Sequence, residues 1–203
     1  MSDDLANRVG TILTGTASGL ISMAVFTPVY AIWPVFAWLV PGVIFFLLAV
    51  AWSAYLAVSA ARLLRLGREL PHETNAYDDR IAKGMGIVSG IQGGLILTSG
   101  VALALIGRWT WILPVVILIV ALHFYPMTRI FRRTIDYYLG TAMLIVALIG
   151  LYLSAQEAVP WQTTWGITGI GATLVTTAYG LWIRLTARRV LTDYEALRRS
   201  IAS

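Results

Sequence analysis

Six long apolar stretches run through the chain, and short polar segments separate them. They cover residues 9–32, 35–61, 81–107, 111–130, 135–155 and 164–185. Each has about the 20 mostly apolar residues that a helix needs to cross the hydrocarbon core of a bilayer. None alternates polar and apolar positions as a strand of a membrane barrel does, so helices are favoured. The pattern therefore predicts an all-α, polytopic transmembrane helix bundle of six spans.

The composition agrees with this interpretation. Hydrophobic residues make up 58% of the chain and charged residues only 12%, against about 25% charged residues in soluble domains. A water-soluble fold of 203 residues could not hide so much apolar surface. The chain has no cysteine, which excludes disulfides, thiolate metal sites and cysteine nucleophiles.

The basic residues predict the orientation of the spans. Fourteen of the fifteen lie in or beside alternate gaps between the apolar stretches or near the chain ends, and only Arg108 lies on the opposite side. The fourteen are Arg8, Arg62, Arg65, Arg68, Arg80, Lys83, Arg129, Arg132, Arg133, Arg184, Arg188, Arg189, Arg198 and Arg199. Because cytoplasmic loops are enriched in Lys and Arg, we expect both termini in the cytoplasm. The net charge of +5 is thereby explained by topology and lipid contact, without a nucleic-acid partner.

The opposite loops are short and rich in Trp and Pro, which suits tight turns and the headgroup layer. We therefore expect three helical hairpins, N-in and C-in, in the inner membrane of a bacterial cell. The transmembrane domain is predicted over residues 1–186 and a basic amphipathic tail over 187–203. Thr192 and Glu195 have capping-box spacing, which indicates a separate tail helix on the membrane or on a partner. A simple extension of the last span is the alternative.

Glycines are spaced for close helix packing in two of the spans. Gly15 and Gly19 form one GxxxG pair, and Gly86, Gly90 and Gly94 form two overlapping pairs. Small residues at this spacing allow helix backbones to approach closely in lipid. Packing within the bundle is the simpler interpretation, and an interface with a like chain or a partner is the alternative.

Two polar side chains lie well inside predicted spans. Gln92 stands between glycines in the third span, and His123 precedes Pro126, which frees a backbone carbonyl in the fourth. Either side chain can hydrogen-bond between helices, which is the simpler role, or line a polar path. Haem or metal binding is not supported, because the other histidine, His72, lies in a loop. We predict no cofactor.

Residues 122–132, followed by residues 137–140, resemble a signature of uncharacterised small bacterial multi-pass membrane proteins. In those proteins a histidine–aromatic–x–proline element closes one span, and a basic, aromatic turn opens the next. Here the element is His123-Phe124-Tyr125-Pro126, and Met127-Thr128 stands where Leu-Ala is more usual. The resemblance implies a membrane location and no known activity.

The charged residues limit the chemistry available in the membrane. All ten acidic residues fall in loops, tails or the ends of spans, whereas ion-coupled transport commonly uses acids within the membrane. His72, Glu73, Asp78 and Asp79 could bind a cation, although a solvated loop is the simpler interpretation. Arg129, Arg132 and Arg133 are predicted to contact lipid headgroups.

No nucleophile elbow, HExxH helix, P-loop or dinucleotide fingerprint occurs in the sequence. We therefore expect a non-enzymatic integral membrane protein, an accessory or scaffold component that packs with partner or like chains. The alternative is a small transporter or channel for a neutral or anionic solute or a lipid, with Gln92 and His123 lining its path.

Overall fold

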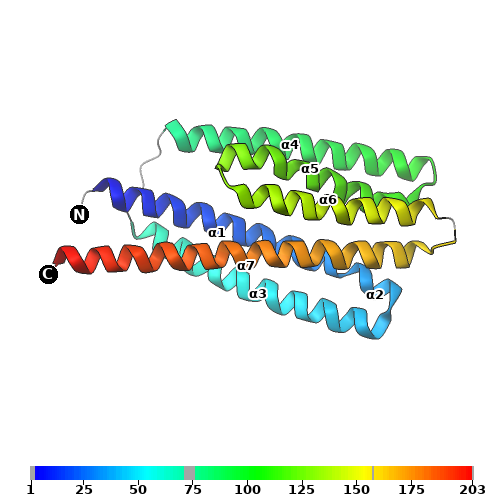
Figure 1. Cartoon of the computed structure of the whole chain (residues 1–203), viewed down its shortest axis with the longest axis horizontal. Helices are drawn as coiled ribbons and strands as arrows, with labels where there is room; N and C mark the ends of the chain where they lie inside the picture. Colours follow the sequence, from blue (N-terminus) through cyan, green and yellow to red (C-terminus); the bar gives the residue numbers. More distant parts are fainter. Residues whose placement is uncertain (1–2, 71–75, 157, 203) are drawn as a thin grey trace. The chain divides into compact units, whose positions relative to one another are not determined.

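The chain is almost entirely helical (Figure 1). The structure is a computed structural model that describes the backbone of residues 3–70, 76–156 and 158–202. Its helices are α1 (Asp3–Ala31), α2 (Trp33–Ala37), α3 (Leu39–Arg68), α4 (Ala76–Leu105), α5 (Ile112–Phe131), α6 (Thr134–Ala155) and α7 (Trp161–Ala202), with a 3-10 turn η1 (Trp109–Trp111) before α5. Six helical segments of the described chain are long and apolar enough to cross a membrane. The all-α class and the six long apolar helices are thus confirmed.

The helices divide into two compact units. Unit 1 consists of Met1–Pro28, Leu48–Thr74 and Thr176–Ser203, and unit 2 of Val29–Leu47 and Asn75–Val175. Unit 1 thus holds parts of α1, α3 and α7, while unit 2 holds all of α4, α5 and α6. The boundaries fall within the long helices, so the units do not correspond to the predicted division at residue 186, which stays a prediction.

Unit 1 is a three-helix bundle with an apolar interior and a few buried hydroxyls. Leu20 of α1 and Leu56 of α3 are fully buried. Thr27 donates a hydrogen bond to Thr176 of α7 over 3.2 Å. Such threonines are tolerated in apolar helices because their hydroxyls find partners on the same or a neighbouring helix.

Unit 2 is built around α5, which packs against both α4 and α6 (Figure 1). Its core contains Ile117 and Ala121 of α5, Met143 and Ala147 of α6, and Ala172 of α7. Alanines at these positions keep the helices close, because a small side chain lets neighbouring backbones approach. Many large apolar side chains are exposed on these helices, among them Ile87 and Leu95 of α4 and Leu148 of α6.

The boundary between the first two spans lies further along the chain than the sequence predicted. The first apolar segment runs through α2 to Ala37, and the break comes at Trp38, whose backbone is extended at φ −142° and ψ 92°. Pro34 is one of the first two residues of α2. Backbone N–H groups in the first turn have no partner within the helix, so the N–H that proline lacks costs no hydrogen bond there. The predicted second span, which began at Val35, is therefore corrected to α3.

The last helix is continuous from Trp161 to Ala202, so the separate tail helix was the wrong alternative. Thr192 does not cap a helix; its hydroxyl donates to the Arg188 carbonyl within α7 over 3.0 Å.

Aromatic side chains gather at one end of unit 2. The Trp33 and Trp165 rings meet edge to face with centroids 4.6 Å apart, and Trp161 stands 5.1 Å from Trp165. The indole N–H of Trp165 donates to the Thr110 carbonyl over 2.9 Å. The hydroxyl of Ser154 donates to the same carbonyl over 3.1 Å. These bonds join η1 to α6 and α7 at a level that suits amphipathic indole rings.

Candidate functional site

Gln92 lies on the face of α4 that is turned toward α5. Half-buried positions recur every three or four residues along α4 and include Ile81, Met85, Val88, Gln92, Ile96, Ser99 and Leu103. This spacing marks a single helix face, and α5 is a helix on which α4 packs. Gln92 therefore lies on the half-buried face of α4 and not on its exposed face.

His123 reaches the same contact from α5. Its ring hydrogen-bonds with the backbone of Val88, one helical turn before Gln92. Its Nδ1 is buried without a hydrogen-bond partner among the described residues. Val88 and Gln92 are separated by a rise of about 6 Å along α4. The structure therefore brings the two predicted site residues to one helix interface.

This pair offers hydrogen-bonding chemistry. It combines a carboxamide with an imidazole whose buried Nδ1 has no hydrogen-bond partner among the described residues. Groups of three or more metal-ligating side chains do not occur in the part of the chain that the structure describes. Of the predicted loop cluster, His72 and Glu73 lie outside the described residues, as do the side chains of Asp78 and Asp79.

The predicted packing glycines of α4 do not contact the rest of unit 2. A Cβ atom added at Gly86, Gly90 or Gly94 would meet no described heavy atom within 4 Å. All three are exposed, on a face different from that of Val88 and Gln92. The packing of α4 on α5 thus leaves this glycine face, defined here as Gly86, Gly90 and Gly94, uncovered within the unit.

The two glycines of the α1 pair differ in how closely another helix approaches them. A Cβ at Gly15 would meet nothing described within 4 Å, whereas one at Gly19 would lie 3.2 Å from the Ile183 Cδ1 atom of α7. Only Gly19 therefore stands at a close helix contact within unit 1. A packing role for Gly15 stays a prediction.

Several close helix contacts use glycines outside the GxxxG pairs. A Cβ at Gly140 would lie 2.9 Å from the Phe124 Cβ, and one at Gly180 would lie 2.7 Å from a Leu56 methyl. At Gly150 of α6 it would lie 2.7 Å from the Thr168 hydroxyl and 2.9 Å from the Pro114 ring. The spacing of residues along one helix does not predict these close contacts, because each contact depends on which residue of another helix faces the glycine.

The three predicted headgroup arginines lie around the turn between α5 and α6. Arg132 ends α5 in the left-handed conformation, with φ 54° and ψ 40°. The Arg133 guanidinium stands over the Phe131 ring, 5.0 Å from its centroid. Arg129 and Arg132 are exposed and Arg133 is half-buried. Their contact with lipid headgroups stays a prediction.

Two charged residues near span ends have roles that sequence reasoning missed. Asp136, in the first turn of α6, is fully buried, where a negative charge is favoured by the helix dipole. Arg184 of α7 donates to the Ser59 hydroxyl over 3.1 Å and lies 5.9 Å from the Tyr55 ring centroid. The first-turn position of Asp136 is visible in the sequence, but its burial is not.

Comparison of the whole chain with protein-family models, with curated proteins and with solved structures gave no match.

Proposed function

We propose that this chain is a non-enzymatic integral membrane protein, an accessory or scaffold component that packs with partner or like chains. The observation that carries this proposal is the uncovered glycine face of α4. The most apolar window of α4 has 0% of its residues buried, whereas the other five candidate spans bury between 28% and 50%. Among the described spans, α4 is thus the helix with most surface left for another molecule.

Physical chemistry in lipid favours a helix as occupant of such a face. Lipid chains are as apolar as leucine, so helices associate through close van der Waals contact rather than through the hydrophobic effect. Glycines one turn apart remove the side chains that would hold two backbones apart. A second helix gains close backbone contact at the glycine face, which a leucine-lined face of the same helix does not allow.

The proposal includes a location and an orientation. We propose that the protein lies in a bacterial inner membrane, as three helical hairpins with both termini in the cytoplasm. The charge alternation supports this orientation, because the ends enriched in arginine are retained on the cytoplasmic side. An even number of spans also requires both termini to be on one side.

A leucine at the centre of the glycine face tests the association. Fluorescence energy transfer between labelled chains in bilayers measures it, and co-purification from native membranes measures partner chains. In Gly90→Leu, overpacking of about 1–3 kcal/mol should weaken association by about tenfold. The matched control is Ala102→Leu, an exposed position of α4 about 120° around the helix from Gly90. A monomeric, partner-free wild-type chain in bilayers would refute the proposal.

The second candidate is a small transporter or channel for a neutral or anionic solute or a lipid. The observation that favours it is the buried Nδ1 of His123, which has no hydrogen-bond partner among the described residues. His123 belongs to α5 and lies beside Val88, on the face of α4 that also carries Gln92. Flux of a solute into liposomes, lost in both Gln92→Leu and His123→Ala, would support transport. Unchanged flux in both variants would eliminate this path.

A further inference from the structure

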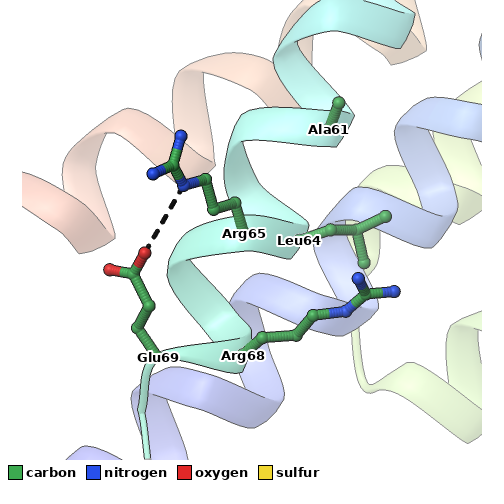
Figure 2. A pocket seen from close by; sticks show the side chains of 5 residues that line it. All are labelled: Ala61, Leu64, Arg65, Arg68 and Glu69. Carbon is green, nitrogen blue, oxygen red and sulfur yellow. Dashed lines mark ion pairs between the residues drawn. The ribbon is translucent and has the colours of Figure 1, made fainter.

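Two grooves on unit 1 join end to end along α3. The first, called the tail groove, has a volume of about 440 Å³ and lies between α1 and α3. Ala24 of α1 and Ala54 and Ala57 of α3 are among its lining residues. The second, called the basic groove, has about 490 Å³ and is lined by Ala61, Leu64, Arg65, Arg68 and Glu69 (Figure 2). Ala61 and Leu64 line both, so the two form one continuous depression.

The tail groove fits an extended apolar chain. Alanines on both helices leave a channel where larger side chains would fill the surface, and Ile21 and Val25 of α1 also line it. The residues of α3 that line the tail groove run from Val50 to Leu64, a rise of about 21 Å along the helix. One leaflet accounts for about 15 Å of the hydrocarbon core, which is about 30 Å thick. The channel is therefore long enough to hold an acyl chain that crosses one leaflet.

The basic groove supplies positive charge at the end of that channel. Figure 2 shows Arg68 on the side of α3 that carries Leu64, and Arg65 directed toward Glu69. Arg65 Nε lies 3.5 Å from the Glu69 carboxylate, with 85% and 62% of the two side chains exposed. Such an exposed pair contributes little by itself. Arg65 can therefore exchange this carboxylate for a phosphate, a group that guanidinium binds well.

We infer that the joined grooves bind one anionic phospholipid, with an acyl chain in the tail groove and its phosphate at Arg68 and Arg65. Charge and shape together select this occupant. An apolar helix would fill the tail groove but leave the arginines unmatched, and free phosphate would use the arginines but not the channel. The arginines of the α5–α6 turn are not part of this site. The inference does not depend on association through α4.

Native mass spectrometry of the purified full chain in non-ionic detergent tests this site. The probes are phosphatidylglycerol and phosphatidylcholine with identical acyl chains. We expect one phosphatidylglycerol to be retained more strongly than phosphatidylcholine, by about fivefold for each arginine engaged. Arg68→Gln should lower that retention by about fivefold. Ala57→Leu, which fills the tail groove, should also lower retention of phosphatidylglycerol.

Three controls separate a defined site from general lipid contact. Ala51→Leu places the same side chain elsewhere on the exposed surface of α3, and Arg108→Gln removes an exposed charge just before η1; neither should change retention. Glu69→Gln should increase it, because Arg65 loses its competing carboxylate. A misfolded variant cannot produce this gain.

Several results would overturn the inference. Equal retention of the two lipids would show that the arginines do not select the anionic headgroup. Equal losses of phosphatidylglycerol retention in Ala57→Leu and Ala51→Leu would show that the lipid only surrounds the protein and occupies no defined site. Displacement of the lipid by inorganic phosphate would assign the arginines to a soluble anion. A decrease or no change in Glu69→Gln would exclude Arg65 from the site.

Discussion

At the scale of residues, what stands opposite a glycine decides its effect more than the motif to which it belongs. Gly150 of α6 lies against the Thr168 hydroxyl and the Pro114 ring, whereas Gly90 and Gly93 of α4 have no described neighbour within 4 Å of an added Cβ. Neither contact of Gly150 can move easily, because the ring is rigid and the Thr168 hydroxyl is hydrogen-bonded to the Thr164 carbonyl. Glycines of identical chemistry therefore have opposite expected responses to substitution.

Gly150→Ala tests this contrast in stability. We expect a loss of about 1–3 kcal/mol from overpacking, reduced by up to about 1 kcal/mol from the better helix propensity of alanine. The control, Gly93→Ala, has open space and should be neutral or slightly stabilising. Thermal unfolding in detergent measures both. If Gly150→Ala is as stable as Gly93→Ala, the α6–α7 contact is not as close as described.

At the scale of elements, the helices follow the apolar pattern closely, but their ends do not. The six apolar runs predicted the six spans because length and hydropathy alone select segments that can cross a bilayer. The break at Trp38 and the uninterrupted α7 were not predicted. Thr192 and Glu195 have capping-box spacing, but the Thr192 hydroxyl donates to the Arg188 carbonyl in the preceding turn of the same helix. Thr192 therefore does not begin a new helix.

The continuity of α7 is tested by the distance between two spin labels. Labels at Leu181 and Ala196, both exposed, should be separated by about 22 Å along one straight helix. We expect a single narrow distribution in the wild-type chain. Asp193→Pro should broaden it, because proline within a helix removes a hydrogen bond and clashes with the preceding turn. A broad wild-type distribution would instead indicate a hinge before Thr192.

The candidate site was predicted in its members but not in its arrangement. Gln92 and His123 are conspicuous in the sequence because polar side chains are rare within spans. Their meeting at one helix interface depends on the rotation of α4 about its axis, which its glycine-rich sequence does not specify. The same rotation leaves Gly90 exposed. The joined grooves of unit 1 could not be predicted from the sequence either. Ala24 and Ala57 are far apart in the chain, and their meeting depends on how α1 and α3 pack.

At the scale of the whole molecule, the charge pattern predicts a definite orientation in the membrane. The chain contains no cysteine, so single cysteines introduced by mutation can be labelled without interference. Gln156→Cys, between α6 and α7, should react with an impermeant maleimide added outside intact cells. Glu69→Cys should react only after permeabilisation. The reverse pattern would place the termini outside and contradict the interpretation of the arginines.

Association through the glycine face of α4 is the central claim for the molecule, and site-directed photo-crosslinking in native membranes tests it most directly. A photoactivatable maleimide would be attached to single cysteines at Gly86, Gly90, Gly94 or Ala102. The account predicts discrete protein adducts from the three glycine positions, either with a second copy or with one defined partner, and none from Ala102. Only lipid adducts at all four positions, or equal protein adducts at all four, would contradict it.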